Sequence, residues 1–76
     1  MTYQITLKTM EDIKNLNDMA FNYDGKIIVS NGLDYVDARS ILFLFNLIGK
    51  PINLVFPDHE EPNKISKFLK KIDCLF

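Results

Sequence analysis

The chain has 76 residues, of which 47% are hydrophobic and 25% are charged, and this is the composition of a globular domain rather than of a disordered or collagen-like chain. Nine basic and ten acidic residues leave a formal net charge of -1, so no broad basic surface is expected for a nucleic-acid backbone. We therefore expect a single domain over residues 1–76 that does not bind nucleic acid.

The cysteine content and the lengths of the apolar runs indicate where the protein resides. Cys74 is the single cysteine and cannot form a disulfide within the chain, and no signal peptide precedes the first strand-like segment. The longest apolar run, residues 41–45, is far shorter than the ~20 residues that a membrane span needs. We expect a cytoplasmic protein without membrane insertion, in which Cys74 is a half-buried apolar side chain rather than a reactive thiol.

The N-terminal segment predicts a strand and then a helix. Apolar and polar residues alternate in YQITLK, which predicts a half-buried strand over residues 3–8. Thr9 and Asp12 have the spacing of a capping box, in which two side chains bond free backbone amides of the first helical turn. Apolar residues then recur at helical spacing, so a helix is expected over residues 10–21.

A hairpin and a second helix are predicted next. The segments KIIVS and LDYV flank Asn31 and Gly32, a dipeptide that favours the positive φ angles of a tight turn. Two antiparallel strands joined by such a turn are therefore expected. The second helix is expected over residues 37–48, with Asp37 as its cap and with Gly49 ending it in the left-handed conformation.

The last third of the chain predicts one more strand, INLVF, and one more helix. Asp58 and Glu61 again have capping-box spacing, and Pro62 suits a first helical turn. The third helix then shows an apolar stripe opposite a row of lysines; the stripe contains Ile65, Phe68, Leu69 and Ile72. The elements form a β-α-β-β-α-β-α string, which predicts an α+β fold with helices on one face of a four-stranded sheet. The strand order stays open, because a split β-α-β, ferredoxin-like fold has the same leading string.

The segment VDARSILFLFNL, residues 36–47, resembles the second-helix region of HPr, the phosphocarrier of the bacterial sugar phosphotransferase system. In that family a V-x-A-K-S-I pattern leads into the helix. The Asn31-Gly32 hairpin, the KPINL strand and the last amphipathic helix resemble the corresponding HPr elements, so the resemblance covers nearly the whole chain. It implies an HPr-like open-faced β-sandwich, with a four-stranded antiparallel sheet and three helices on one face.

The chain departs from the HPr pattern at the residue that carries phosphate. The family uses a histidine in a G-[LI]-H-A-R-P segment at the start of the first helix, whereas Lys8, Thr9 and Met10 stand at that place here. The resemblance therefore implies an HPr-like protein that lacks the phosphoacceptor histidine. We expect a regulatory or protein-interaction module that is not an enzyme and needs no cofactor.

Two alternatives stay open. His59 is the only histidine, and a phosphocarrier could use it, although a lone histidine among carboxylates is more typical of a solvated loop and supports no metal site. The segment NGLDYVDARS is also similar to the V-D-Y-I-D-S-S-G segment of STAS domains, the anti-sigma-factor-antagonist fold, and ISKFLKKIDCLF is similar to their last segment. Against this, the chain is short, and the phosphorylated serine of that motif would fall on Arg39.

The HPr resemblance implies a site at the start of the second helix. Ser40 matches the serine that a dedicated kinase phosphorylates in low-GC bacteria; otherwise it is an unmodified hydroxyl of the first turn. Ile41, Leu42 and Phe45 match the exposed apolar patch that docks on partners; otherwise they are core, since a small domain needs its apolar side chains. We expect Arg39, Ser40 and this patch to bind protein partners, such as phosphotransferase-system proteins, transcriptional regulatory proteins or an HPr-kinase-like enzyme.

Overall fold

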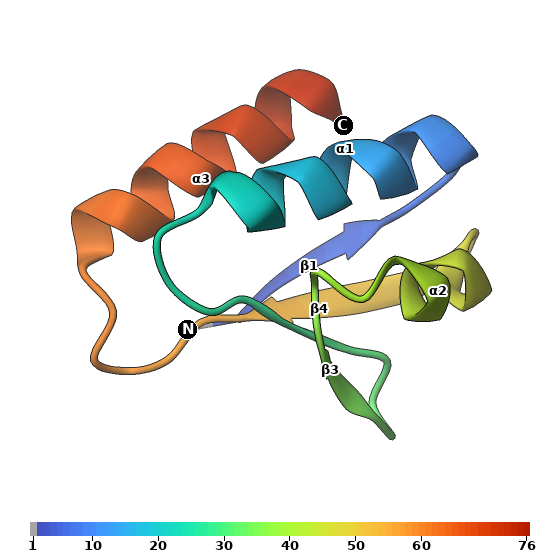
Figure 1. The fold of residues 1–76 in the computed structure, drawn as a ribbon, viewed down its shortest axis with the longest axis horizontal. Coiled ribbons are helices and arrows are strands. Elements are labelled where there is room, and N and C mark those ends of the chain that lie inside the picture. The colour runs from blue at the N-terminus through green and yellow to red at the C-terminus, as the bar shows by residue number, and fades with distance from the viewer. Residues whose placement is uncertain (1) are drawn as a thin grey trace.

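The computed structural model describes residues 2–76, which form one four-stranded sheet with helices packed against it (Figure 1). The elements follow in the order β1 (Thr2–Thr6), α1 (Met10–Asn22), β2 (Ile28–Ser30), β3 (Tyr35–Asp37), α2 (Ile41–Leu44), the 3-10 helix η1 (Phe45–Leu47), β4 (Pro51–Val55) and α3 (Pro62–Leu75). Figure 1 shows α1 and α3 running together above the sheet, with α2 at the right, below the first turns of α1.

The sheet has the strand order β1-β4-β2-β3, and each of its three pairings is antiparallel. The last strand in the sequence, β4, therefore lies between β1 and β2, and the connection through α1 leaves a strand-wide gap that β4 fills. This arrangement confirms the predicted α+β class with a four-stranded antiparallel sheet. It also fixes the strand order that the string of elements left open.

The core lies between the sheet and the helices. Along β4 the side chains alternate, with Ile52 and Leu54 fully buried toward the helices and Asn53 and Val55 half-buried on the other face. The helices contribute the apolar stripes that their periodicity predicted. The buried apolar residues are Leu7, Ile13, Leu16, Ala20, Ile27, Val29, Ala38, Leu44, Leu47, Ile52, Leu54, Phe56, Ile65, Phe68 and Ile72.

The first two helix starts that the sequence predicted have different outcomes. At α1 the capping box is present: Thr9 Oγ1 accepts the Asp12 N–H at 3.1 Å, and Asp12 Oδ2 accepts the Thr9 N–H at 3.2 Å. The predicted second helix over residues 37–48 is wrong at its start, because Asp37 ends β3 and pairs with Ile28. The Ala38 N–H donates to the Ile27 C=O at 2.9 Å and continues this pairing, so Asp37 cannot cap a helix.

Of three further local predictions, the tight β2–β3 turn and the capping box of the third helix are wrong, and the left-handed Gly49 is confirmed. The β2–β3 turn is longer than a tight two-residue turn, because residues 31–34 separate the strands, and of Asn31 and Gly32 only the glycine has positive φ, at 96°. Gly49 has the expected left-handed backbone, with φ of 82°. The third helix starts after Glu61 without a side-chain capping bond, although a proline does occupy its first turn.

The described part of the chain also bears on the membrane and cysteine predictions. Among residues 2–76, no helix is both long enough and apolar enough to span a bilayer. Cys74 is exposed near the end of α3 rather than half-buried, because it lies off the apolar stripe of that helix.

The capping box at α1 yields a test of stability. Replacing Thr9→Ala removes the oxygen that accepts the Asp12 amide, so we expect the free energy of unfolding to fall by about 1 kcal/mol. Urea denaturation followed by circular dichroism measures this change. The control is Ser66→Ala on the exposed face of α3, where alanine is the better helix former and no loss is expected. An unchanged midpoint in the Thr9 variant would contradict the capping role.

Candidate functional site

The segment between β3 and β4 lies at the same end of the molecule as the start of α1, on the right of Figure 1. A backbone hydrogen bond holds the two connections together, since the Gly49 N–H donates to the Leu7 C=O at 2.7 Å. The predicted site residues of the second helix therefore border the place where the first helix begins.

A surface ion pair between Asp37 and Arg39 lies in the segment that leads into α2. The Arg39 guanidinium donates to both carboxylate oxygens of Asp37, from Nε at 3.1 Å and from a terminal nitrogen at 2.8 Å, and the Arg39 N–H donates to the same carboxylate at 2.9 Å. Hydrogen bonding by Arg39 lowers the pKa of Asp37, and the same bonds raise the pKa of Arg39. The guanidinium thus lies at the surface against the Asp37 carboxylate, bonded to both of its oxygens.

Ala38, between these two charged residues, anchors the segment in the core. Its side chain is fully buried, and its C=O accepts the Asn17 side-chain amide at 3.4 Å. Asn17 is one of the two buried polar residues of the described chain and comes from α1. The bond gives this buried amide a partner and ties the start of α2 to α1.

Ser40 directly precedes α2, and its side chain is exposed. Its N–H donates to the Asp37 C=O at 2.9 Å, and its C=O accepts the Leu44 N–H at 3.3 Å, so the backbone is held. The hydroxyl forms no capping hydrogen bond. Because α2 has only four residues, its dipole would stabilise a phosphate at Ser40 less than the longer predicted helix would.

The structure separates the two apolar faces that periodicity could not distinguish. Leu44 and Leu47 face the core and are buried, whereas the side chain of Leu42 is 76% exposed. Ile41 and Phe45 are half-buried and pack against the rim of the core. Of the three residues expected to form an exposed patch, Leu42 is fully available and the other two present only their edges.

Just before α1, two backbone amides donate to a carboxylate of the chain itself. Asp12 Oδ2 accepts the Lys8 N–H at 2.9 Å and the Thr9 N–H at 3.2 Å. A helix start normally attracts anions through its free amides. Here Asp12 places a negative charge at the helix start and accepts the Lys8 and Thr9 amides.

His59 belongs to the loop between β4 and α3. This loop is at the left end of Figure 1, far from the start of α1. It is exposed, and its neighbour Glu60 forms an ion pair with Lys64 at 3.0 Å. Hydrogen bonding by Lys64 lowers the pKa of Glu60. Within residues 2–76, no three His, Cys, Asp or Glu side chains are grouped so that they could hold a metal ion.

The fold is similar to that of a solved structure. The structure of HPr-C-His from Thermoanaerobacter tengcongensis matches with a TM-score of 0.69 and 22% sequence identity, over 96% of this chain and 89% of that chain. The fold is thus HPr-like, as the resemblance implied. No protein-family model and no curated protein sequence matches the chain.

Two site contacts were absent from the predictions. The ion pair between Asp37, the last residue of β3, and Arg39 has one local signal, the spacing of two opposite charges two residues apart. The bond from Asn17 to the Ala38 carbonyl joins residues 21 positions apart, and no local pattern indicates it.

The Asp37–Arg39 pair yields a test of the pH dependence of stability. The folded-state pKa of Asp37 lies below its ordinary value of 3.8, so the pair contributes stability above that value and loses it as the pH falls through the folded-state pKa. We therefore expect the urea midpoint to fall less in Asp37→Asn than in the wild type between about pH 5 and about pH 1. Arg39→Gln should show the same reduced dependence. Parallel pH profiles for all three proteins would contradict the assignment.

Proposed function

We propose that this chain is an HPr-like regulatory module of the phosphotransferase network, which binds other proteins and does not carry phosphate from enzyme I to sugar transporters. The observation that supports this most strongly is at the start of α1, where the Asp12 carboxylate accepts the Lys8 and Thr9 amides. A phosphohistidine carrier needs an imidazole beside free amides and an arginine that hold the phosphoryl group. Here Thr9 and Asp12 instead form the capping box that stabilises α1.

The proposed partner-binding surface consists of Arg39, Ser40, Ile41, Leu42 and Phe45. Leu42 is its apolar centre, since this side chain is exposed by 76%. The edges of Ile41 and Phe45 extend the apolar area, and Arg39 adds a charge that Asp37 holds in place. A small patch of this kind suits a transient contact, with an arginine and an apolar anchor as its main contributors.

The partners that suit this surface are phosphotransferase-system proteins, transcriptional regulatory proteins and an HPr-kinase-like enzyme. The last would act on Ser40, whose hydroxyl is exposed and forms no capping bond. Phosphorylation there would place about two negative charges next to Leu42. Such a change would alter which partners the apolar patch accepts, and this makes Ser40 the proposed regulatory residue.

Substitution of Leu42 tests the surface. Leu42→Asp replaces an exposed apolar side chain by a charge, so we expect at least about tenfold weaker binding to purified enzyme I, to an HPr-kinase-like enzyme or to a transcriptional regulator that binds the wild type. Biolayer interferometry measures these affinities. Leu42 is preferred to Phe45 for this test because Phe45 also packs against the core.

Leu33→Asp is the matched control, because Leu33 is also an exposed leucine, at 88%, but lies in the β2–β3 turn. This variant should bind as the wild type does. Equal loss of affinity in both variants would point to a general effect of the added charge and would contradict the proposed surface.

Phosphate transfer tests the proposed loss of carrier function and the role of Ser40. With phosphoenolpyruvate and enzyme I, we expect no acid-labile phosphate on the chain. With ATP and an HPr-kinase-like enzyme, we expect one acid-stable phosphate that Ser40→Ala abolishes. Intact-mass spectrometry before and after acid treatment measures both.

An acid-labile phosphate that His59→Gln removes would show that the chain is a carrier, and would overturn the proposal. A wild type that takes no phosphate from the kinase would leave the interaction module without its proposed regulation at Ser40. An active HPr in the same reactions confirms that both enzymes work.

A further inference from the structure

Strand β1 is an open edge of the sheet. Within the described residues its only strand neighbour is β4. Edge strands are usually protected against further pairing by charged residues, proline, glycine bulges or a covering element. The sequence of β1, TYQIT, contains none of these residues. Its free edge is therefore a surface that another extended segment can pair with.

The alternation of the backbone identifies which groups of β1 face this edge. The Ala38 N–H donates to the Ile27 C=O at 2.9 Å, which fixes which residues of β2 pair toward β3. In antiparallel sheets successive residues turn their N–H and C=O groups to opposite sides. The same alternation can be followed through the residue pairs of β2 with β4 and of β4 with β1. It places the backbone N–H and C=O groups of Gln4 and Thr6 on the open edge. Pro51, which has no N–H to donate, lies opposite Thr6, and this agrees with backbone groups of Thr6 that point away from β4.

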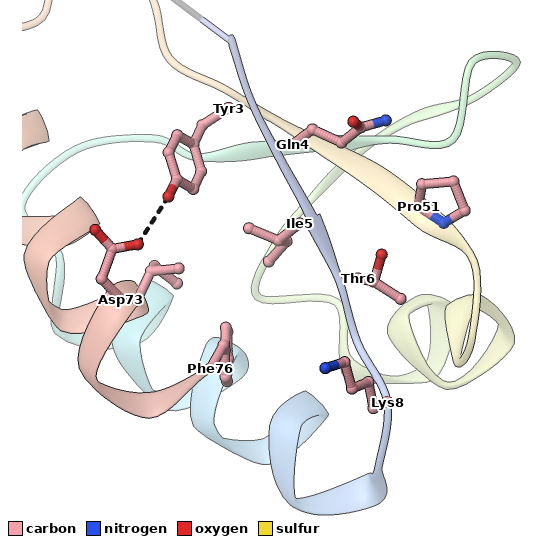
Figure 2. A pocket seen from close by; sticks show the side chains of 9 residues that line it. Tyr3, Gln4, Ile5, Thr6, Lys8, Pro51, Asp73 and Phe76 are labelled. Carbon is pink, nitrogen blue, oxygen red and sulfur yellow. Dashed lines mark hydrogen bonds between the residues drawn. The ribbon is translucent and has the colours of Figure 1, made fainter.

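A hollow of about 470 Å³ runs along this same edge, between β1 and the last turns of α3 (Figure 2). Tyr3 and Ile5 come from the strand and Asp73 and Phe76 from the helical side, so strand and helix form opposite walls. Extended peptides in several protein families bind in this kind of place, where they add a strand to a sheet edge and insert alternate side chains into pockets.

The two ends of the hollow have opposite charges. At one end the Tyr3 hydroxyl donates a hydrogen bond to Asp73 Oδ1, with 2.7 Å between the two oxygens. This hydrogen bond raises the pKa of Tyr3, so the hydroxyl stays a donor. At the other end the Lys8 side chain points from the strand toward Phe76, as Figure 2 shows. The apolar side chains of Ile5 and Phe76 lie between the two charges.

We infer that the open edge of β1 binds an extended peptide segment of a partner protein as an additional strand. The segment places an apolar side chain in the hollow, a basic side chain beside Asp73 and an acidic side chain beside Lys8. The edge amides and carbonyls of Gln4 and Thr6 form the backbone bonds. This site is distinct from the proposed Leu42 surface, and it stands or falls separately from that function.

A free peptide fits the hollow better than a second copy of this chain does. A second copy could pair its own β1 along the edge, but its inward side chains Tyr3 and Ile5 already pack against its own core. Its Tyr3 hydroxyl is also bonded to its own Asp73. Such a pairing would leave the hollow unfilled, whereas a peptide strand has side chains free to enter it.

An NMR titration of the whole ¹⁵N-labelled chain tests the inference. The probes are the blocked peptides Arg-Thr-Val-Thr-Glu and Glu-Thr-Val-Thr-Arg, which present the same side chains for the two strand directions. With one of them we expect the amide resonances of Gln4 and Thr6 to shift and their hydrogen exchange to slow. A blocked peptide of threonines alone should cause neither change, because it has no apolar or charged side chain to place.

Two variants locate the contact. Asp73→Asn keeps an acceptor for Tyr3 but removes the charge, so the affinity should fall about two- to fivefold, as for an exposed ion pair. Asp34→Asn in the β2–β3 turn, outside the lining of the hollow, is the matched control and should not change it. Gln4→Pro removes an edge N–H at a position where proline is tolerated, and should abolish binding.

The inference is overturned if neither probe shifts the β1 amides at millimolar concentration, or if a folded Gln4→Pro variant binds as the wild type does. If Gln4→Pro does not fold, the exchange measurement and the comparison of Asp73→Asn with Asp34→Asn decide. Light scattering of the chain alone adds one outcome: a dimer that Gln4→Lys dissociates would assign the edge to a second copy and overturn the peptide assignment.

Discussion

The pairing of β4 with a strand on either side is the constraint on which the rest of the structure depends. The strand bonds to β1 along its whole length and to β2 along its last three residues. Its inward residues Ile52 and Leu54 are fully buried, and Phe56 directly after it packs edge-on against Tyr23 and Phe68. Removing β4 would separate β1 from the hairpin and take the centre out of the core. Every other element is positioned relative to this strand.

The position of β4 also explains where the two proposed binding surfaces lie. The connection that leads into β4 contains α2, so the Leu42 patch is at the end of the sheet where β4 starts and α1 begins. Because β4 occupies the centre, β1 is displaced to the edge and keeps one side unpaired. One topological feature thus produces an apolar patch at an end of the sheet and a free backbone along its side.

Much of the fold could be predicted from periodicity, because α1, α3 and the longer strands each present one apolar face to one core. The second helix was overestimated for a physical reason. Residues 37–48 are compatible with a helix, but the Ala38 N–H bonds to the Ile27 carbonyl and the helix is delayed to Ile41. Tertiary pairing overrides local propensity here. At Glu61 the capping-box spacing exists without the capping bond.

The site was less predictable than the fold. The HPr resemblance implied where the candidate site lies, yet periodicity could not tell Leu42, which is exposed, from Leu44, which is buried, because every neighbour is apolar. The hollow beside β1 had no local signal, since Tyr3 and Asp73 are 70 positions apart. Contacts of that range depend on the packing of the first strand against the last helix, and this is known only from the folded structure.

The central place of β4 has a consequence for synthesis of the chain. Proteins emerge from the ribosome from the N-terminus, and N-terminal parts often fold first. Here β1, α1 and the hairpin are made before β4, but β1 and β2 do not pair with each other. The nascent chain therefore cannot close this sheet piece by piece. Until β4 has left the exit tunnel, β1 therefore has no strand to pair with and the four-stranded sheet cannot form.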